Sequence, residues 1–154
     1  MSESTAALVL TPLLVAALVQ LARIDLRHRR LPDVLTLPIL MVGLVLSAWR
    51  AQGVPVPELL GAAGGFLLFW GLGEAHFRWR GTEGLGLGDA KLLAAAGAWL
   101  GWRDLPLLIL LAASGALAAV ALGHIRHREV AFGPWLAVAF LLMWLGRLVR
   151  EGAW

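Results

Sequence analysis

The amino-acid sequence predicts an all-α fold, a polytopic membrane bundle of about six transmembrane helices that forms one domain over residues 1–154. Of these residues, 60% are hydrophobic and only 15% are charged, and the mean hydropathy is +0.79. A soluble domain has roughly 45–50% apolar and about 25% charged residues. The apolar residues also gather into six runs separated by short loops: 6–22, 34–49, 58–77, 90–102, 105–123 and 131–149.

The first three runs are expected to cross the membrane as helices, since about 20 apolar residues span a bilayer. We expect the first run to stay in the protein rather than to be cleaved as a signal peptide, because residues 1–5 carry Glu3 and no basic residue. The second run is slightly short, and Pro38 is expected to kink or start its helix. In the third run, Gly61 and Gly65 have the spacing that lets two helices approach closely.

The fourth run, 90–102, is too short to cross a bilayer, because about thirteen helical residues reach only about 20 Å of a roughly 30 Å core. We therefore expect Asp89 to cap this helix below the membrane surface, preceded by non-helical backbone with glycines at 84, 86 and 88. Gly97 and Gly101 again suggest close helix packing. The last two runs are long enough to span.

The basic residues predict which loops face the cytoplasm. With the N-terminus outside, the three inner loops would carry nine basic residues and the outer segments four, which favours both termini outside. The inner nine are Arg23, Arg27, Arg29, Arg30, Arg78, Arg80, Lys91, Arg126 and Arg128, and the outer four are Arg50, Arg103, Arg147 and Arg150.

Several classes of function are disfavoured by composition. The sequence pI is about 11.0, but the basic residues are scattered over short loops, so no nucleic-acid partner is predicted. The chain has no cysteine, which excludes zinc-thiolate sites and cysteine nucleophiles. His124 and His127 could form half of a metal site, but no third ligand is evident in the sequence. We predict no metal and no cofactor.

Asp25 and Asp89 are the candidate catalytic residues, because both lie at the predicted cytoplasmic ends of helices and can share one cavity. Simpler roles exist: Asp89 can cap a helix, and Asp25 can pair with nearby arginines. Two neighbouring carboxyl groups do not both ionise readily, so one would be charged and activate water while the other donates a proton. The alternative is a non-enzymatic scaffold or a proton- or ion-relaying transporter subunit, although no run has an acidic residue near its middle.

These segments resemble the type IV prepilin peptidase family, the GxGD-type membrane aspartyl proteases. The resemblance covers about residues 15–145 in the same order. Its motifs are Gly86-Leu87-Gly88-Asp89-Ala90-Lys91-Leu92-Leu93, Ile24-Asp25-Leu26-Arg27 with Leu31-Pro32-Asp33, and Phe132-Gly133-Pro134.

The resemblance implies that Asp25 and Asp89 are the catalytic pair and that Gly86, Gly88 and Lys91 belong to the active-site loop. It also implies a multi-pass protein of the bacterial inner membrane that removes the basic leader of a prepilin or pseudopilin at the cytoplasmic face. Asp33 begins the second predicted helix, where a capping role suffices. Long members also carry a zinc-binding cysteine segment and methylate the new N-terminus with S-adenosylmethionine; we expect no methyltransferase activity here.

Overall fold

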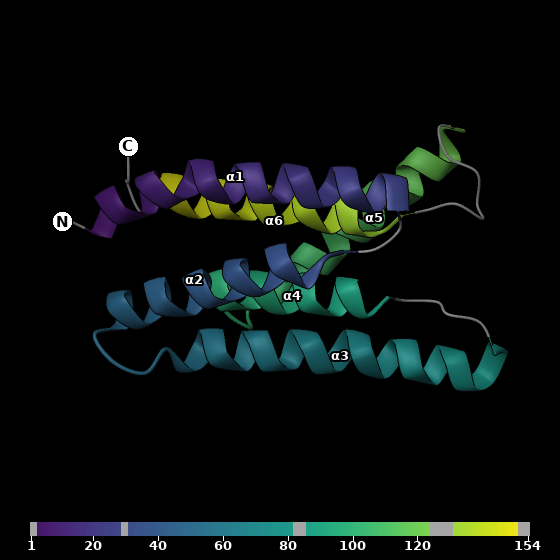
Figure 1. Ribbon diagram of the computed structural model, residues 1–154, viewed down its shortest axis with the longest axis horizontal. Helices are drawn as coiled ribbons and strands as arrows, with labels where there is room; N and C mark the ends of the chain where they lie inside the picture. Colours follow the sequence, from purple (N-terminus) through teal and green to yellow (C-terminus); the bar gives the residue numbers. More distant parts are fainter. Residues whose placement is uncertain (1–2, 29–30, 82–85, 124–130, 151–154) are drawn as a thin grey trace.

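The described part of the protein is a bundle of α helices. The computed structural model describes residues 3–28, 31–81, 86–123 and 131–150, in which there are six helices and no strand. Figure 1 shows them in chain order: α1 (Glu3–His28), α2 (Asp33–Ala51), α3 (Val56–Arg80), α4 (Leu87–Leu100), α5 (Leu105–Ala121) and α6 (Gly133–Arg150).

These helices coincide with the six predicted apolar runs, so the all-α fold class is confirmed. Four of the described helices are long and apolar enough to cross a membrane: α1 from Val9, α2, α3 and α6. Helix α5 is apolar but has 17 residues, and α4 has 14. The start of α1 and the end of α6 lie at the same end of the bundle (Figure 1), as the predicted topology requires.

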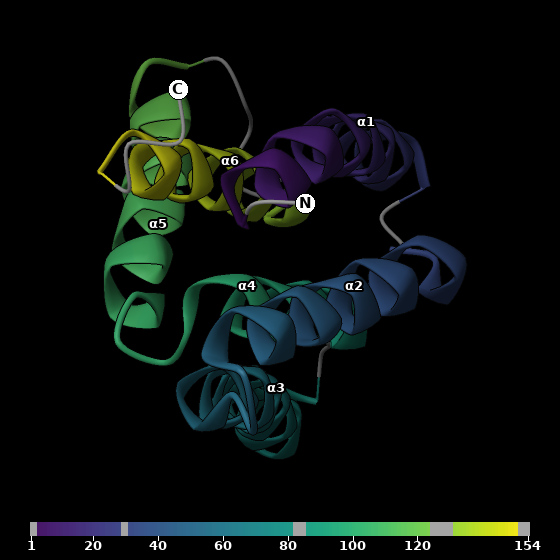
Figure 2. The same cartoon turned by 90° about the vertical axis from the view of Figure 1, so that its left-hand side faces the viewer.

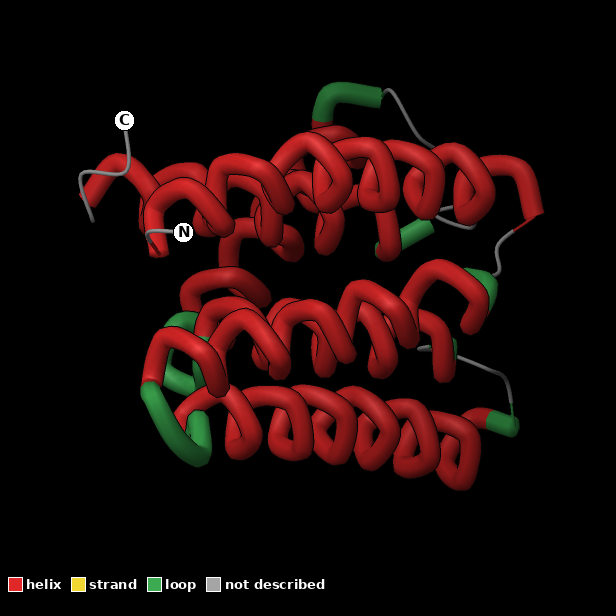
Figure 3. The backbone as a smooth tube through the Cα atoms, turned by 60° about the vertical axis from the view of Figure 1, so that its left-hand side comes forward, coloured by secondary structure: helices red, strands yellow, loops and turns green. Residues whose placement is uncertain are grey.

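The bundle has two groups of helices, and α4 connects them. Helices α2 and α3 pack on α4, whereas α1 and α5 pack on α6 (Figure 2). The groups meet mainly where α4 contacts α6 and where α1 contacts α2. The described loops lie at the two ends of the bundle (Figure 3). Helix α4 is consequently the central helix, with Ala90 and every residue from Leu92 to Leu100 buried.

Small residues let α3 and α4 approach closely, which agrees with the close packing expected from the spacing of Gly61 with Gly65 and of Gly97 with Gly101. A Cβ atom added to Gly61 would lie 2.7 Å from the Gly97 carbonyl oxygen and 2.8 Å from the Trp102 nitrogen. Polar contacts fix α4 against α2. Ser47 donates a hydrogen bond to the Ala98 carbonyl (3.0 Å), and Trp99 Nε1 donates to the Ile39 carbonyl (2.8 Å).

The expectation that Asp89 caps α4 is wrong. Helix α4 begins at Leu87, so Gly88 and Asp89 lie in its first turn, and the extended Gly86 is the N-cap. The Gly86 carbonyl accepts hydrogen bonds from the backbone N–H groups of Asp89 and Ala90, 3.1 and 3.3 Å away. Glycine is among the residues favoured at the N-cap position. Of the two roles expected for Pro38, a helix start is ruled out because Pro38 lies inside α2; a kink at this position stays a prediction.

Candidate active site

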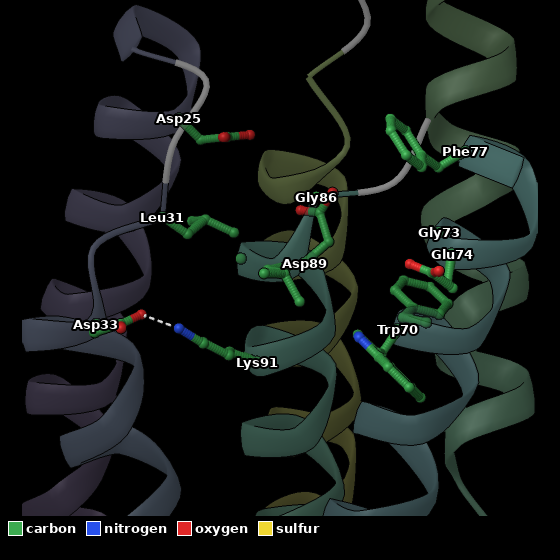
Figure 4. A pocket seen from close by; sticks show the side chains of 13 residues that line it. Asp25, Leu31, Asp33, Trp70, Gly73, Glu74, Phe77, Gly86, Asp89 and Lys91 are labelled. Atoms are coloured by element: carbon green, nitrogen blue, oxygen red, sulfur yellow. Dashed lines mark hydrogen bonds and ion pairs between the residues drawn. The ribbon is translucent and has the colours of Figure 1, made fainter. Parts of the chain in front are cut away.

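A cavity of about 550 Å³ opens at the end of the bundle where α1 and α3 end and α4 and α6 begin. Its walls come from three parts of the fold: the end of α1 with the start of α2, the second half of α3, and the start of α4 (Figure 4). The lining residues are Asp25, Leu31, Asp33, Phe69, Trp70, Gly73, Glu74, Phe77, Gly86, Leu87, Gly88, Asp89 and Lys91.

Asp25 lies almost one turn before the end of α1 and is only 6% exposed. Its side chain extends from α1 toward the start of α4 (Figure 4). The amino end of α6 lies directly against it, since a Cβ atom on Gly133 would be 2.6 Å from Asp25 Oδ2 and 3.0 Å from Cγ. Glycine at position 133 therefore leaves the space that the Asp25 carboxyl group occupies.

Asp89 lies in the first turn of α4 and is half-buried on the same cavity. The positive end of the α4 dipole lies beside its carboxyl group. Asp25 and Asp89 are close enough for their charges to interact directly. The structure thus brings the two predicted catalytic residues, 64 positions apart in sequence, into one cavity from two helices.

Gly86, Gly88 and Lys91, which were expected in an active-site loop, also line this cavity; Gly88 and Lys91 lie in α4 rather than in a loop. Lys91 Nζ donates a hydrogen bond to Asp33 Oδ1 at 2.6 Å, forming an ion pair between α4 and α2. The prediction that Asp33 needs only a capping role is wrong, because Pro32 is the N-cap of α2 and Asp33 pairs with Lys91.

The aromatic side chains of the wall that α3 contributes were not predicted from the sequence. Trp70, Gly73, Glu74 and Phe77 line the cavity and have the spacing of one helical face. Glu74 also accepts a hydrogen bond from Arg78 Nε at 2.9 Å. The spacing was visible in the sequence, but nothing there showed what the face contacts.

The candidate metal ligands cannot be placed. His124 and His127 lie outside the described residues. Within the described ranges, no group of three or more histidine, cysteine, aspartate or glutamate side chains could hold a metal ion.

Helices long enough to cross a membrane and a cavity with paired aspartates define a polytopic membrane protein with a two-carboxylate site. A model of the type IV leader peptidase family matches residues 12–124, so the chain belongs to this family. Both aspartates and all the other residues that line the cavity fall within the matched residues. No solved structure matches the chain.

The curated relatives include several named prepilin leader peptidase/N-methyltransferase. The protein from Aeromonas salmonicida is 42% identical over 94% of this chain and 51% of its own length. The one from Dickeya chrysanthemi is 46% identical over 79% of this chain and 44% of its own length. The one from Escherichia coli is 40% identical over 79% and 56%. The chain thus spans about half the length of the curated relatives it matches.

Proposed function

We propose that this chain is an intramembrane aspartyl endopeptidase that removes the leader peptide from prepilins or pseudopilins. The observation that carries the proposal is the meeting of Asp25 and Asp89 in one cavity, in a chain whose family relatives are named prepilin leader peptidases. Residues 1–154 would form a single membrane-embedded peptidase domain.

The proposed chemistry uses the two carboxyl groups in different protonation states. The charged carboxylate accepts a proton from a water molecule, whose oxygen attacks the scissile carbonyl carbon, while the protonated carboxyl donates its proton to the carbonyl oxygen. The tetrahedral intermediate then collapses. Its C–N bond breaks as the first aspartate returns a proton to the leaving amine. The second aspartate recovers its proton from one hydroxyl group of the intermediate, which becomes the new carboxyl group. The net reaction consumes one water and requires no cofactor.

The shape of the site is suited to a peptide that arrives from the membrane. Trp70 and Phe77 give the cavity an aromatic wall on α3, and the carboxyl groups lie across from it (Figure 4). The leader helix would enter laterally from the lipid, and the segment around the cleaved bond would unwind into the cavity. The distribution of basic residues supports a cytoplasmic location for this end of the bundle in the bacterial inner membrane.

The relatives are named for two activities, and we assign the peptidase to this chain because Asp25 and Asp89 lie in the matched part. The absence of N-methyltransferase activity stays a prediction. We expect the mature substrate to gain no methyl group when S-adenosylmethionine is supplied, which mass spectrometry of the new N-terminus measures. A methylated product would contradict this expectation.

The function is tested by reconstituting the purified chain with a full-length prepilin and following leader removal by gel shift. The proposal expects one cut between leader and mature region, whose position is read by mass spectrometry. A panel of prepilins and pseudopilins avoids dependence on one substrate. If a folded, reconstituted chain cuts none of them, the proposed function is wrong.

Gly133→Ala is expected to slow leader removal without unfolding the protein. The added methyl group would lie 2.6 Å from Asp25 Oδ2 and must displace the carboxyl group. A misplacement of about 1 Å can reduce a rate about 100-fold. The matched control is Gly146→Ala in the same helix, where a Cβ atom meets nothing within 4 Å. Equal rates for the two variants would show that Gly133 does not position Asp25.

A further inference from the structure

The two aspartates belong to helices that do not pack extensively on each other. Asp25 is in α1, which packs on α6 and α2, and Asp89 is in α4, which packs mainly on α3 and α2. The distance between the carboxyl groups therefore depends on the contacts that connect the end of α1 to the start of α4. Two such contacts come from residues 31–33, which follow α1 in the chain and lead into α2.

The first contact is made by Leu31, which is 8% exposed. A Cβ atom on Gly88 would lie 2.8 Å from Leu31 Cβ and 3.3 Å from its Cδ1, and a Cβ atom on Gly133 would lie 3.3 Å from the same Cδ1. Leu31 is thus seated between two glycines. One of them directly precedes Asp89, and the other abuts Asp25.

The second contact is the ion pair between Lys91 Nζ and Asp33 Oδ1, at 2.6 Å. It joins the turn of α4 that carries Asp89 to the first residue of α2. The side chains are 29% and 54% exposed. Ion pairs with this much solvent add little to the stability of a fold. Its effect is therefore expected on the geometry of the cavity, which both residues line.

We propose that Leu31 and the Lys91–Asp33 ion pair form a clamp that positions Asp25 against Asp89. Lys91 and Asp33 are positioning residues in this proposal, which rests on the proposed peptidase function. The clamp connects α2 to α4 close to Asp89. Leu31 also contacts Gly133, so it helps to fix where Gly133 and the neighbouring Asp25 lie. Without the ion pair, residues 31–33 keep the contact of Leu31 with Gly88 but lose the polar link between Asp33 and α4.

A direct role of Lys91 on the substrate makes a different prediction. If the ammonium group itself bound the scissile carbonyl or the substrate chain, an aspartate at position 91 could not replace it. If only the link between α2 and α4 matters, the charges can be exchanged. The double variant Asp33→Lys with Lys91→Asp separates the two roles.

The experiment measures kcat and KM for leader removal by the reconstituted protein. Asp33→Asn and Lys91→Met are each expected to lower kcat about 10- to 100-fold with little change in KM, because misplaced reacting groups slow the chemical step. The exchanged double variant should recover most of the lost kcat. Asp33→Glu, which keeps the charge, should stay close to wild type. The control is Glu58→Gln, which removes a charge in the first turn of α3, at the far end of that helix from the cavity residues.

The clamp is wrong if both single variants keep the wild-type kcat, or if a folded double variant is as slow as the single variants. If the double variant does not accumulate in the membrane, Asp33→Glu decides: it must keep its kcat where Asp33→Asn loses it. A wild-type protein that cuts no prepilin would refute the proposed function instead, so the two failures are distinguishable.

Discussion

Asp25→Asn and Asp89→Asn are each expected to slow leader removal by about 10² to 10⁴-fold. Asparagine nearly matches aspartate in size, so the packing of Asp25 against Gly133 is retained. An amide, however, can neither take a proton from water nor supply one to the scissile carbonyl. Each variant therefore removes one half of the acid–base pair. The measurement is the initial rate with one purified prepilin, at equal amounts of folded enzyme.

The control for these variants must lie away from the cavity. Asp33→Asn is unsuitable, because Asp33 pairs with Lys91 and lines the same cavity. Glu58→Gln removes an acidic group in the first turn of α3 and should cut at the wild-type rate. Wild-type cleavage by either asparagine variant would show that the aspartate pair has only a structural role.

Gly61→Leu and Gly97→Leu are each expected to destabilise the protein. A side chain at either position would collide with the backbone of the facing helix, as at the Gly97 carbonyl oxygen, 2.7 Å from a Cβ on Gly61. Backbone cannot rotate away, so α3 and α4 must separate. Overpacking costs about 1–3 kcal/mol, and the separation would also move Asp89.

Thermal unfolding in detergent measures this effect, and Gly64→Leu is the matched control. Gly64 lies in the same helix, and a Cβ atom there meets nothing within 4 Å. We expect lower melting temperatures for Gly61→Leu and Gly97→Leu and little change for Gly64→Leu. Similar melting temperatures for the three variants would mean that α3 and α4 do not cross at Gly61 and Gly97.

The helices could be predicted from the sequence because long apolar runs in a membrane have few alternative structures. The close contact of Gly61 with Gly97 was also foreseeable as a tendency of each helix, since small residues four apart permit it. The start of α4, in contrast, could not be predicted from the sequence. Glycines at 86 and 88 suggested irregular backbone, whereas the helix begins at Leu87 and its first turn includes Gly88.

The site could be predicted only in part. Asp25 and Asp89 were identified as residue types at helix ends that matched a family motif. Their neighbours depend on contacts between distant parts of the chain, and a single sequence does not encode these as a local pattern. Asp33 and Lys91, which form the ion pair, are 58 positions apart in the sequence. Gly133 lies against Asp25 although more than a hundred positions separate them.

The most direct test of the central claim asks whether α1 and α4 bring positions 25 and 89 into one cavity. Because the chain has no native cysteine, the double variant Asp25→Cys with Asp89→Cys presents only two thiols. A short bifunctional thiol reagent is applied in native membranes, and an engineered protease site between the two positions reports the cross-link. If positions 25 and 89 share a cavity, the cross-linked protein runs as one band after proteolysis. The control variant Gly64→Cys with Asp25→Cys should form no cross-link. Two separate fragments from the 25/89 pair, with both thiols labelled by a monofunctional reagent, would contradict the shared cavity.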